Sequence, residues 1–140
     1  MKPSPLHVDI LTIFPEMIAP YLQGAMLGRG EKAGLLTLRA HQLRQWTKDR
    51  HQKVDDRPFG GGAGMVMKVQ PFYDALLSLG AITKQGVRSK RDASSRVILM
   101  SPRGKRFTQA DAQRLASYKR LVFLCGRYEG IDERVSEHLI

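Results

Sequence analysis

Residues 121–130 read LVFLCGRYEG and join a run of apolar residues to a loop that carries glycine, charges and an aromatic ring. A continuous apolar run of this length is typical of a strand that is covered on both faces of a parallel sheet. Ligands bind in the crevice beyond the carboxyl ends of such strands. The loop after the run is therefore expected to belong to a binding site.

Further apolar runs are expected to form strands at residues 8–14 and 97–100, with a weaker strand at 35–38. The runs at 8–14 and 97–100 also end in loops that contain proline or glycine. Because the carboxyl ends of parallel strands share one edge of a sheet, these loops should meet the loop at 126–130.

Helical patterns lie between the strands. Apolar residues recur with helical spacing over residues 71–79, with Pro71 suited to the first turn and Gly80 to the C-terminal cap. Thr108 and Asp111 resemble a capping box, and a last helix is expected to begin near Asp132. The alternation of strands and helices predicts an α/β domain with a mostly parallel sheet and flanking helices.

A second glycine-bearing segment, residues 55–65, reads DDRPFGGGAGM. Glycine allows positive φ angles and a close approach of the backbone to a ligand. This segment is therefore better suited to a ligand-binding loop than to the hydrophobic core. Neither a P-loop nor the dinucleotide pattern G-x-G-x-x-G fits its spacing. An ordinary mobile surface loop is the alternative interpretation.

The balance of charge favours a polyanionic partner. Lys and Arg outnumber Asp and Glu by 23 to 13, which gives a net charge of +10. One basic cluster lies between Arg88 and Arg106, and a second, at residues 48–53, leads into the glycine segment. A basic face kept for solubility is the alternative, but clusters beside both glycine segments favour nucleic acid. Residues 84–95 are expected to form an exposed or disordered loop.

Other classes of protein find little support. No run of about 18 apolar residues predicts a membrane span, and no export signal is present, so a cytoplasmic protein is expected. The four histidines are scattered and Cys125 is the single cysteine, so no metal site is predicted. Cys125 itself is expected to be a packed thiol.

Several motifs in order carry a resemblance to a known family: FPEM at 14–17, DRH at 49–51, the segment 55–65, SPRG at 101–104 and GRYEGIDER at 126–134. Together they resemble the TrmD family of bacterial tRNA (guanine-N(1)-)-methyltransferases, of the SPOUT class. The resemblance implies a parallel α/β domain with a trefoil knot. It also implies a homodimer that transfers a methyl group from S-adenosyl-L-methionine to N1 of guanosine 37 in tRNA.

The resemblance also assigns residues. The residues that it implies for the methyl donor are Leu99, Met100, Ser101, Pro102, Gly126, Tyr128, Glu129 and Gly130. Those that it implies for the target guanosine and its neighbour are His51, Asp55, Gly60 and Gly64. A carboxylate at position 55 is chemically suited to accept hydrogen bonds from guanine. Glu129 is expected to support the catalytic base or to coordinate Mg²⁺, and a helix-start carboxylate is its structural alternative.

Members of this family continue beyond the position that matches Ile140, with a segment that completes the knot and the donor pocket, a linker bearing an aspartate base, and a tRNA-binding domain. Residues 1–140 are therefore expected to be a truncated donor-binding domain that is inactive and binds the donor weakly by itself. Two other functions stay open: a SPOUT methylase that acts on ribose or another base, and a non-catalytic basic RNA-binding module.

Overall fold

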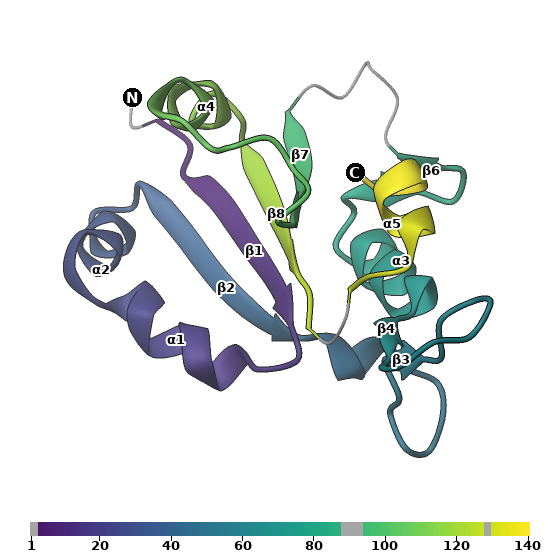
Figure 1. Ribbon diagram of the computed structural model, residues 1–140. Coiled ribbons are helices and arrows are strands. Elements are labelled where there is room, and N and C mark those ends of the chain that lie inside the picture. The colour runs from purple at the N-terminus through teal and green to yellow at the C-terminus, as the bar shows by residue number, and fades with distance from the viewer. Residues whose placement is uncertain (1–2, 88–93, 128–129) are drawn as a thin grey trace.

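The computed structural model of the protein describes residues 3–87, 94–127 and 130–140 (Figure 1). Its elements follow the chain in the order β1 (Leu6–Thr12), α1 (Pro15–Gln23), α2 (Ala25–Lys32), β2 (Leu36–Gln42), the 3-10 helix η1 (Leu43–Trp46), β3 (Asp55–Asp56), β4 (Val66–Met67), α3 (Val69–Ser78), β5 (Ile82–Thr83), β6 (Gly86–Val87), β7 (Ser95–Met100), α4 (Gln109–Leu115), β8 (Arg120–Cys125) and α5 (Glu133–His138).

A four-stranded sheet forms the centre of the molecule, with the strand order β2-β1-β8-β7. Every neighbouring pair in this sheet is parallel. Leu11, Leu124 and Leu99 stand side by side across β1, β8 and β7. The prediction of an α/β domain with a parallel sheet is confirmed.

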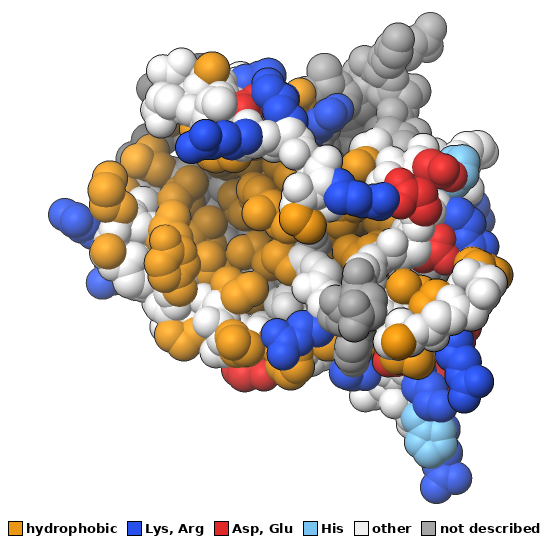
Figure 2. Space-filling model, viewed as in Figure 1, with side chains coloured by type: hydrophobic (Ala, Val, Ile, Leu, Met, Phe, Trp, Pro, Cys, Tyr) orange, Lys and Arg blue, Asp and Glu red, His pale blue; other side chains and the backbone are white. Residues whose placement is uncertain are grey.

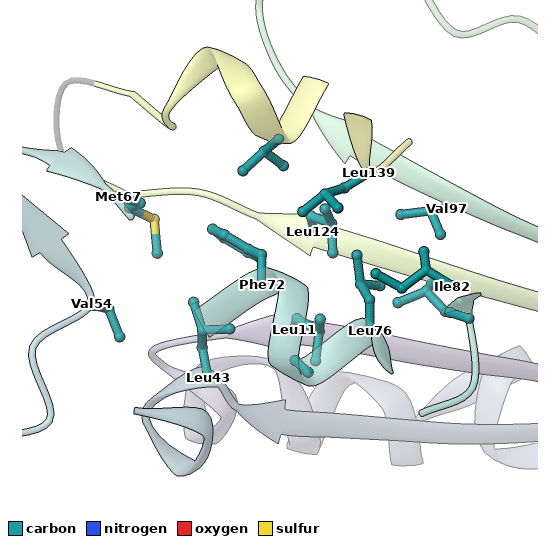
Figure 3. Packing of buried hydrophobic residues seen from close by; sticks show 14 of the residues in the cluster. Leu11, Leu43, Val54, Met67, Phe72, Leu76, Ile82, Val97, Leu124 and Leu139 are labelled. Carbon is teal, nitrogen blue, oxygen red and sulfur yellow. The ribbon is translucent and has the colours of Figure 1, made fainter. Parts of the chain in front are cut away.

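Helices α3 and α5 cover one face of this sheet (Figure 1). Leu11 and Leu124 of the sheet meet Phe72 and Leu76 of α3 in the hydrophobic core, and Leu139 joins them just after α5 (Figure 3). Leu11, Leu124, Phe72 and Leu76 are fully buried. The continuous apolar runs in the sequence therefore supply the sheet side of this core.

The opposite face of the sheet is less covered. Side chains alternate between the two faces of a strand, so Ile10, Phe123 and Ile98 lie opposite the core and form a row across the sheet. All three are half-buried. Helices α1 and α2 contact β2 at one side of this face. Figure 2 shows a hollow lined with hydrophobic side chains over the sheet.

The helix ends follow the expected local chemistry. Helix α3 is followed by Gly80 at φ +71°, and Ala81 N–H donates to the Leu76 carbonyl across the turn, 2.8 Å away. Thr108 and Asp111 form the predicted capping box of α4, in which each side chain accepts a hydrogen bond from the other residue's backbone. The predicted helix at 71–79 is displaced by two residues at its start, and Pro71 lies in its first turn.

The first strand differs from its prediction at both ends, because β1 begins at Leu6 and ends at Thr12 rather than at Phe14. Phe14 is the N-cap of α1 and donates its N–H to Thr12 Oγ1 at 3.1 Å, which turns the chain out of the sheet. Pro15 then occupies the first turn, where a missing N–H costs nothing. Helices α1 and α2 were not predicted, and β2 is longer than the predicted strand at 35–38.

The expected loop at 84–95 contains regular structure at both of its described ends. Strands β5 and β6 form a short antiparallel hairpin that includes its first residues, and β7 begins at Ser95. Residues 88–93 lie outside the described part of the chain, and with them three members of the basic cluster. Within the described residues, no helix has the length and apolar character needed to cross a membrane.

Candidate functional site

A cleft of about 560 Å³ lies at the carboxyl ends of β7 and β8. Its lining includes Leu99, Met100, Ser101, Pro102, Arg103, Gly126, Arg127 and Gly130, together with Val66, Ile131, Asp132, Glu133 and Ser136. The structure thus brings together all of the described residues predicted for the methyl donor. Tyr128 and Glu129, predicted for the same site, lie outside the described residues.

The two glycine-bearing segments are neighbours in space, although they are far apart in the sequence. Met67 of β4 forms a parallel bridge with Ile131, just after the loop at 126–130. Met67 N–H donates to the Gly130 carbonyl, and Asp132 N–H donates to the Met67 carbonyl, each over 3.0 Å. Since β4 directly follows the glycine loop at 57–65, this bridge fixes the loop's end beside the cleft.

The glycine loop adopts backbone angles that other residues rarely use. Gly60, Gly61, Gly62 and Gly64 have φ angles of +79°, +82°, +114° and +85°. These values lie in the region of positive φ that glycine enters without a steric cost. The loop is exposed at all four positions, so its backbone is free to approach a ligand.

The residues predicted for the guanosine lie around this loop rather than in the cleft. Asp55 is half-buried in β3, where it pairs with Met67 of β4. His51 is exposed in the segment before β3. The described residues that line the cleft include neither of them, nor Gly60 or Gly64.

A second, smaller cleft of about 240 Å³ lies beside the glycine loop. Val66 and Asp132 line both clefts, so these two residues form their common wall. The rest of its lining comes from Asp56, Arg57, Phe59, Met67, Lys68, Val69, Gln70 and Arg134. None of these residues was predicted to have a role at the site, although several stand inside the quoted motifs.

Two carboxylates at the main cleft are engaged by arginine. Asp132 accepts from Arg134 Nε at 3.0 Å and from Arg134 Nη2 at 2.7 Å, and these hydrogen bonds lower the pKa of Asp132. Glu133 accepts from Arg103, whose hydrogen bond is the main cause of the lowered pKa of Glu133. Both carboxylates are therefore weak proton acceptors at neutral pH. Of the carboxylates described at this cleft, neither suits a general base.

Contacts around Gly126 and Arg127 shape the floor of the main cleft. A Cβ at Gly126 would lie 2.9 Å from Ile131 Cδ1, so glycine here permits close packing of the two loop ends. Arg127 N–H donates to the Met67 sulfur at 3.1 Å, and its guanidinium lies over the Phe14 ring, 5.0 Å from the centroid. The loop after β1 is thereby joined to the loop after β8.

This arrangement fits the methyl donor that the sequence implies. A cleft of this volume is in the range of small-molecule sites, which combine apolar walls with a few polar groups. Leu99, Val66 and Ile131 supply apolar surface, and the loop backbone at Gly126 and Gly130 can approach a ligand without a Cβ in the way.

Cys125, at the end of β8, is half-buried, and burial raises the pKa of its thiol, as expected for a packed cysteine.

Comparison with known proteins gives a consistent result. A family model described as tRNA (Guanine-1)-methyltransferase TrmD matches residues 6–140. The tRNA (guanine-N(1)-)-methyltransferase of Magnetococcus marinus is 53% identical over 129 residues, which are 92% of this chain and 47% of that protein. The enzyme of the same name from Heliobacterium modesticaldum is 47% identical over 133 residues, which are 94% of this chain and 47% of that protein.

A solved structure agrees with these relatives. The crystal structure of a tRNA (m1G37) methyltransferase from Aquifex aeolicus matches with a TM-score of 0.78 and 30% identity, covering 96% of this chain and 57% of that one. The chain spans about half the length of the curated relatives that it matches. Since the family model matches nearly every residue, the chain belongs to the TrmD family of tRNA (guanine-1) methyltransferases.

Proposed function

We propose that a protein carrying this chain transfers a methyl group from S-adenosyl-L-methionine to N1 of guanosine 37 in tRNA. We further propose that it acts in the cytoplasm as a homodimer whose sites are built from both subunits, and that residues 1–140 supply its donor-binding domain. The supporting observation is the bridge between Met67 and Ile131, which sets the glycine loop beside the cleft. A cleft for the donor and a loop for a nucleotide then lie within reach of each other.

The chain's residues would divide the work between binding and orientation. Leu99 to Pro102 and Gly126 would hold the donor through apolar contacts and backbone groups. When bound, S-adenosyl-L-methionine supplies an electrophilic methyl group. Asp55 and the glycine loop would orient the guanine, because positioning the reacting atoms about 3 to 3.5 Å apart removes a large part of the barrier.

The N1 proton of guanine must leave during the transfer. The carboxylates of Asp132 and Glu133 are held in ion pairs with arginine and have lowered pKa values, so neither suits this task. Glu129 remains a candidate to support the base or to bind Mg²⁺, by family resemblance alone. Loss of a general base costs about 10² to 10⁴ in rate.

The position of the transferred methyl group tests the proposal. A purified protein that carries this chain is incubated with S-adenosyl-L-methionine and a tRNA transcript that has guanosine at positions 36 and 37. We expect 1-methylguanosine at position 37, detected by nuclease digestion and mass spectrometry. A transcript with adenosine at position 37 serves as the control and should remain unmodified. Omission of Mg²⁺ should slow the reaction.

Other products would contradict the proposal. Methylation of ribose, or of another base, would place the protein with a different SPOUT methylase. RNA binding without donor binding or methyl transfer would favour a non-catalytic RNA-binding module. Asp55→Asn separates these cases further, because a ribose methylase has no need of a carboxylate that reads guanine.

A further inference from the structure

Phe59 is the most exposed of the large hydrophobic side chains described, with 85% of its surface open to solvent. It stands in the glycine loop, directly before Gly60. A single exposed apolar side chain is ordinary on a protein surface and needs no explanation by itself. The surroundings of Phe59 make this one different.

Arg134 holds the Phe59 ring in place from one side. Its guanidinium carbon lies over the ring, 5.6 Å from the centroid, which is a cation–π contact. Arg134 is in turn fixed by Asp132, which accepts hydrogen bonds from its backbone N–H, its Nε and its Nη2. The aromatic ring of an otherwise open loop is therefore oriented before any ligand arrives.

The other face of the ring is left to solvent, because the side chain is so largely exposed. Three cations, Arg57, Lys68 and Arg134, line the second cleft together with Phe59. Two carboxylates, Asp56 and Asp132, line it as well, and Asp132 is paired with Arg134. A flat, fixed aromatic surface among cations is the combination that binds unpaired bases, by stacking on the ring and by contact of the phosphates with the cations.

The position of Phe59 also says which base it would hold. Val66 and Asp132 form the common wall of the two clefts, so a base on Phe59 is separated from the main cleft by that wall. The modified guanine has to reach the methyl group of a donor held in the main cleft. A base on Phe59, behind the wall, is therefore assigned to a neighbour of the modified nucleotide.

We propose that Phe59, oriented by Arg134, is a stacking residue for an unpaired RNA base that flanks the target nucleotide. This inference rests on the proposed RNA substrate and adds a specificity-determining contact to it. Arg134 is a positioning residue, because it acts through the Phe59 ring.

The test uses a double variant, Phe59→Trp with Trp46→Phe, in which the introduced indole is the single tryptophan of the chain. Titration with an anticodon stem-loop RNA should quench the emission of this indole, because a stacked base quenches tryptophan. In the otherwise natural chain, Phe59→Ala should weaken binding of the same RNA about 5- to 150-fold, the range found for one stacked base. Arg134→Gln should produce a smaller loss.

Tyr21→Ala is the matched control, since Tyr21 is 75% exposed on α1, away from the glycine loop. It should leave the affinity unchanged, and circular dichroism should show that all variants are folded. Equal affinity of the Phe59→Ala and natural chains, an unquenched indole in the double variant, or no binding of the RNA by the natural chain would each overturn the inference.

Neither readout depends on methyl transfer, so the two proposals fail separately. Quenching of the introduced indole together with a missing 1-methylguanosine product would remove the proposed reaction and leave the stacking contact. The reverse result would remove the stacking contact alone.

Discussion

Arg120, the first residue of β8, donates from Nε at 3.0 Å and from Nη2 at 2.8 Å to the same carboxylate oxygen of Asp9 in β1. The other carboxylate oxygen of Asp9 lies 2.7 Å from His41 Nε2 in β2. Arg120 also donates from Nη1 to the Leu79 carbonyl at the end of α3. One buried carboxylate thus joins three parallel strands, and Arg120 joins them to the helix that covers the core.

Asp9→Asn should destabilise the fold by about 3 kcal/mol, because removal of one partner of a buried ion pair leaves the other charge uncompensated. The free energy of unfolding in urea measures this. Asp56→Asn removes an exposed carboxylate and should change that free energy by less than about 0.5 kcal/mol. An equal, small effect of both substitutions would show that the network contributes nothing.

The same carboxylate predicts a dependence of stability on pH. Burial raises the pKa of Asp9, but the hydrogen bonds from His41 and Arg120 outweigh it, so the pKa lies below its ordinary value of 3.8. The stabilisation is therefore fully present above pH 3.8 and is lost as the pH falls through the lower, folded-state value. The difference between natural protein and Asp9→Asn should shrink in that acidic range and stay constant near neutrality.

Thr108→Ala should cost about 1 kcal/mol of stability, because it removes half of the capping box of α4. Hydrogen bonds from the side chain and the backbone of Thr108 are the main causes that lower the pKa of Asp111 to about 2. In Thr108→Ala this pKa should rise toward 3.8, as an NMR titration of the Asp111 carboxyl would record. Thr108→Ser keeps the hydroxyl and should preserve both properties.

Gly126→Ala should weaken binding of S-adenosyl-L-methionine about tenfold, or about 1.4 kcal/mol, while the fold stays intact. The new methyl group would push Ile131 Cδ1, the end of a flexible side chain, into the main cleft. Calorimetry would measure the affinity for S-adenosyl-L-methionine of a protein that carries this chain, with and without the substitution. Gly24→Ala, where the nearest atoms would be 3.8 Å away, is the control. Unchanged affinity in Gly126→Ala would place the donor elsewhere.

Exchange of Lys48, Arg50 and Lys53 for glutamine should flatten the salt dependence of RNA binding. Each lost phosphate contact reduces the slope of log K against log salt by about 0.7 on single strands. Three exposed basic residues on α2 and β2, Arg29, Lys32 and Arg39, form the matched control set. If both triple variants show the natural slope, or the same altered slope, the cluster before the glycine loop is not a phosphate-binding site.

Local patterns predicted most of the elements that form the core. The apolar runs that became β7 and β8, and the capping box at Thr108, carry their signal within a few adjacent residues. Helices α1 and α2 have no such signal, because Pro20 and Gly24 interrupt the helical pattern. Gly28 is needed at the junction of the two helices, because a Cβ there would lie 2.1 Å from the carbonyl oxygen of Gln23, the last residue of α1.

The position of the candidate site could be predicted from the sequence in part. The rule that ligands bind at the carboxyl ends of parallel strands is enough to place Leu99 and Gly126 together from the order of the apolar runs. The contact between Phe59 and Arg134 could not be predicted, because it depends on the bridge from Met67 to Ile131. A two-residue strand such as β4 has no periodic pattern that would specify its partner.

That bridge has a consequence for local unfolding. The amide protons of Met67 and Asp132 are held by two hydrogen bonds that both join Met67 to residues 130–132, so the two loops cannot separate without breaking both bonds. These two amides should therefore exchange with solvent deuterium in a single opening event, with one common free energy. The glycine loop and the rim of the cleft, 65 positions apart along the chain at Met67 and Asp132, thereby behave as one cooperative unit.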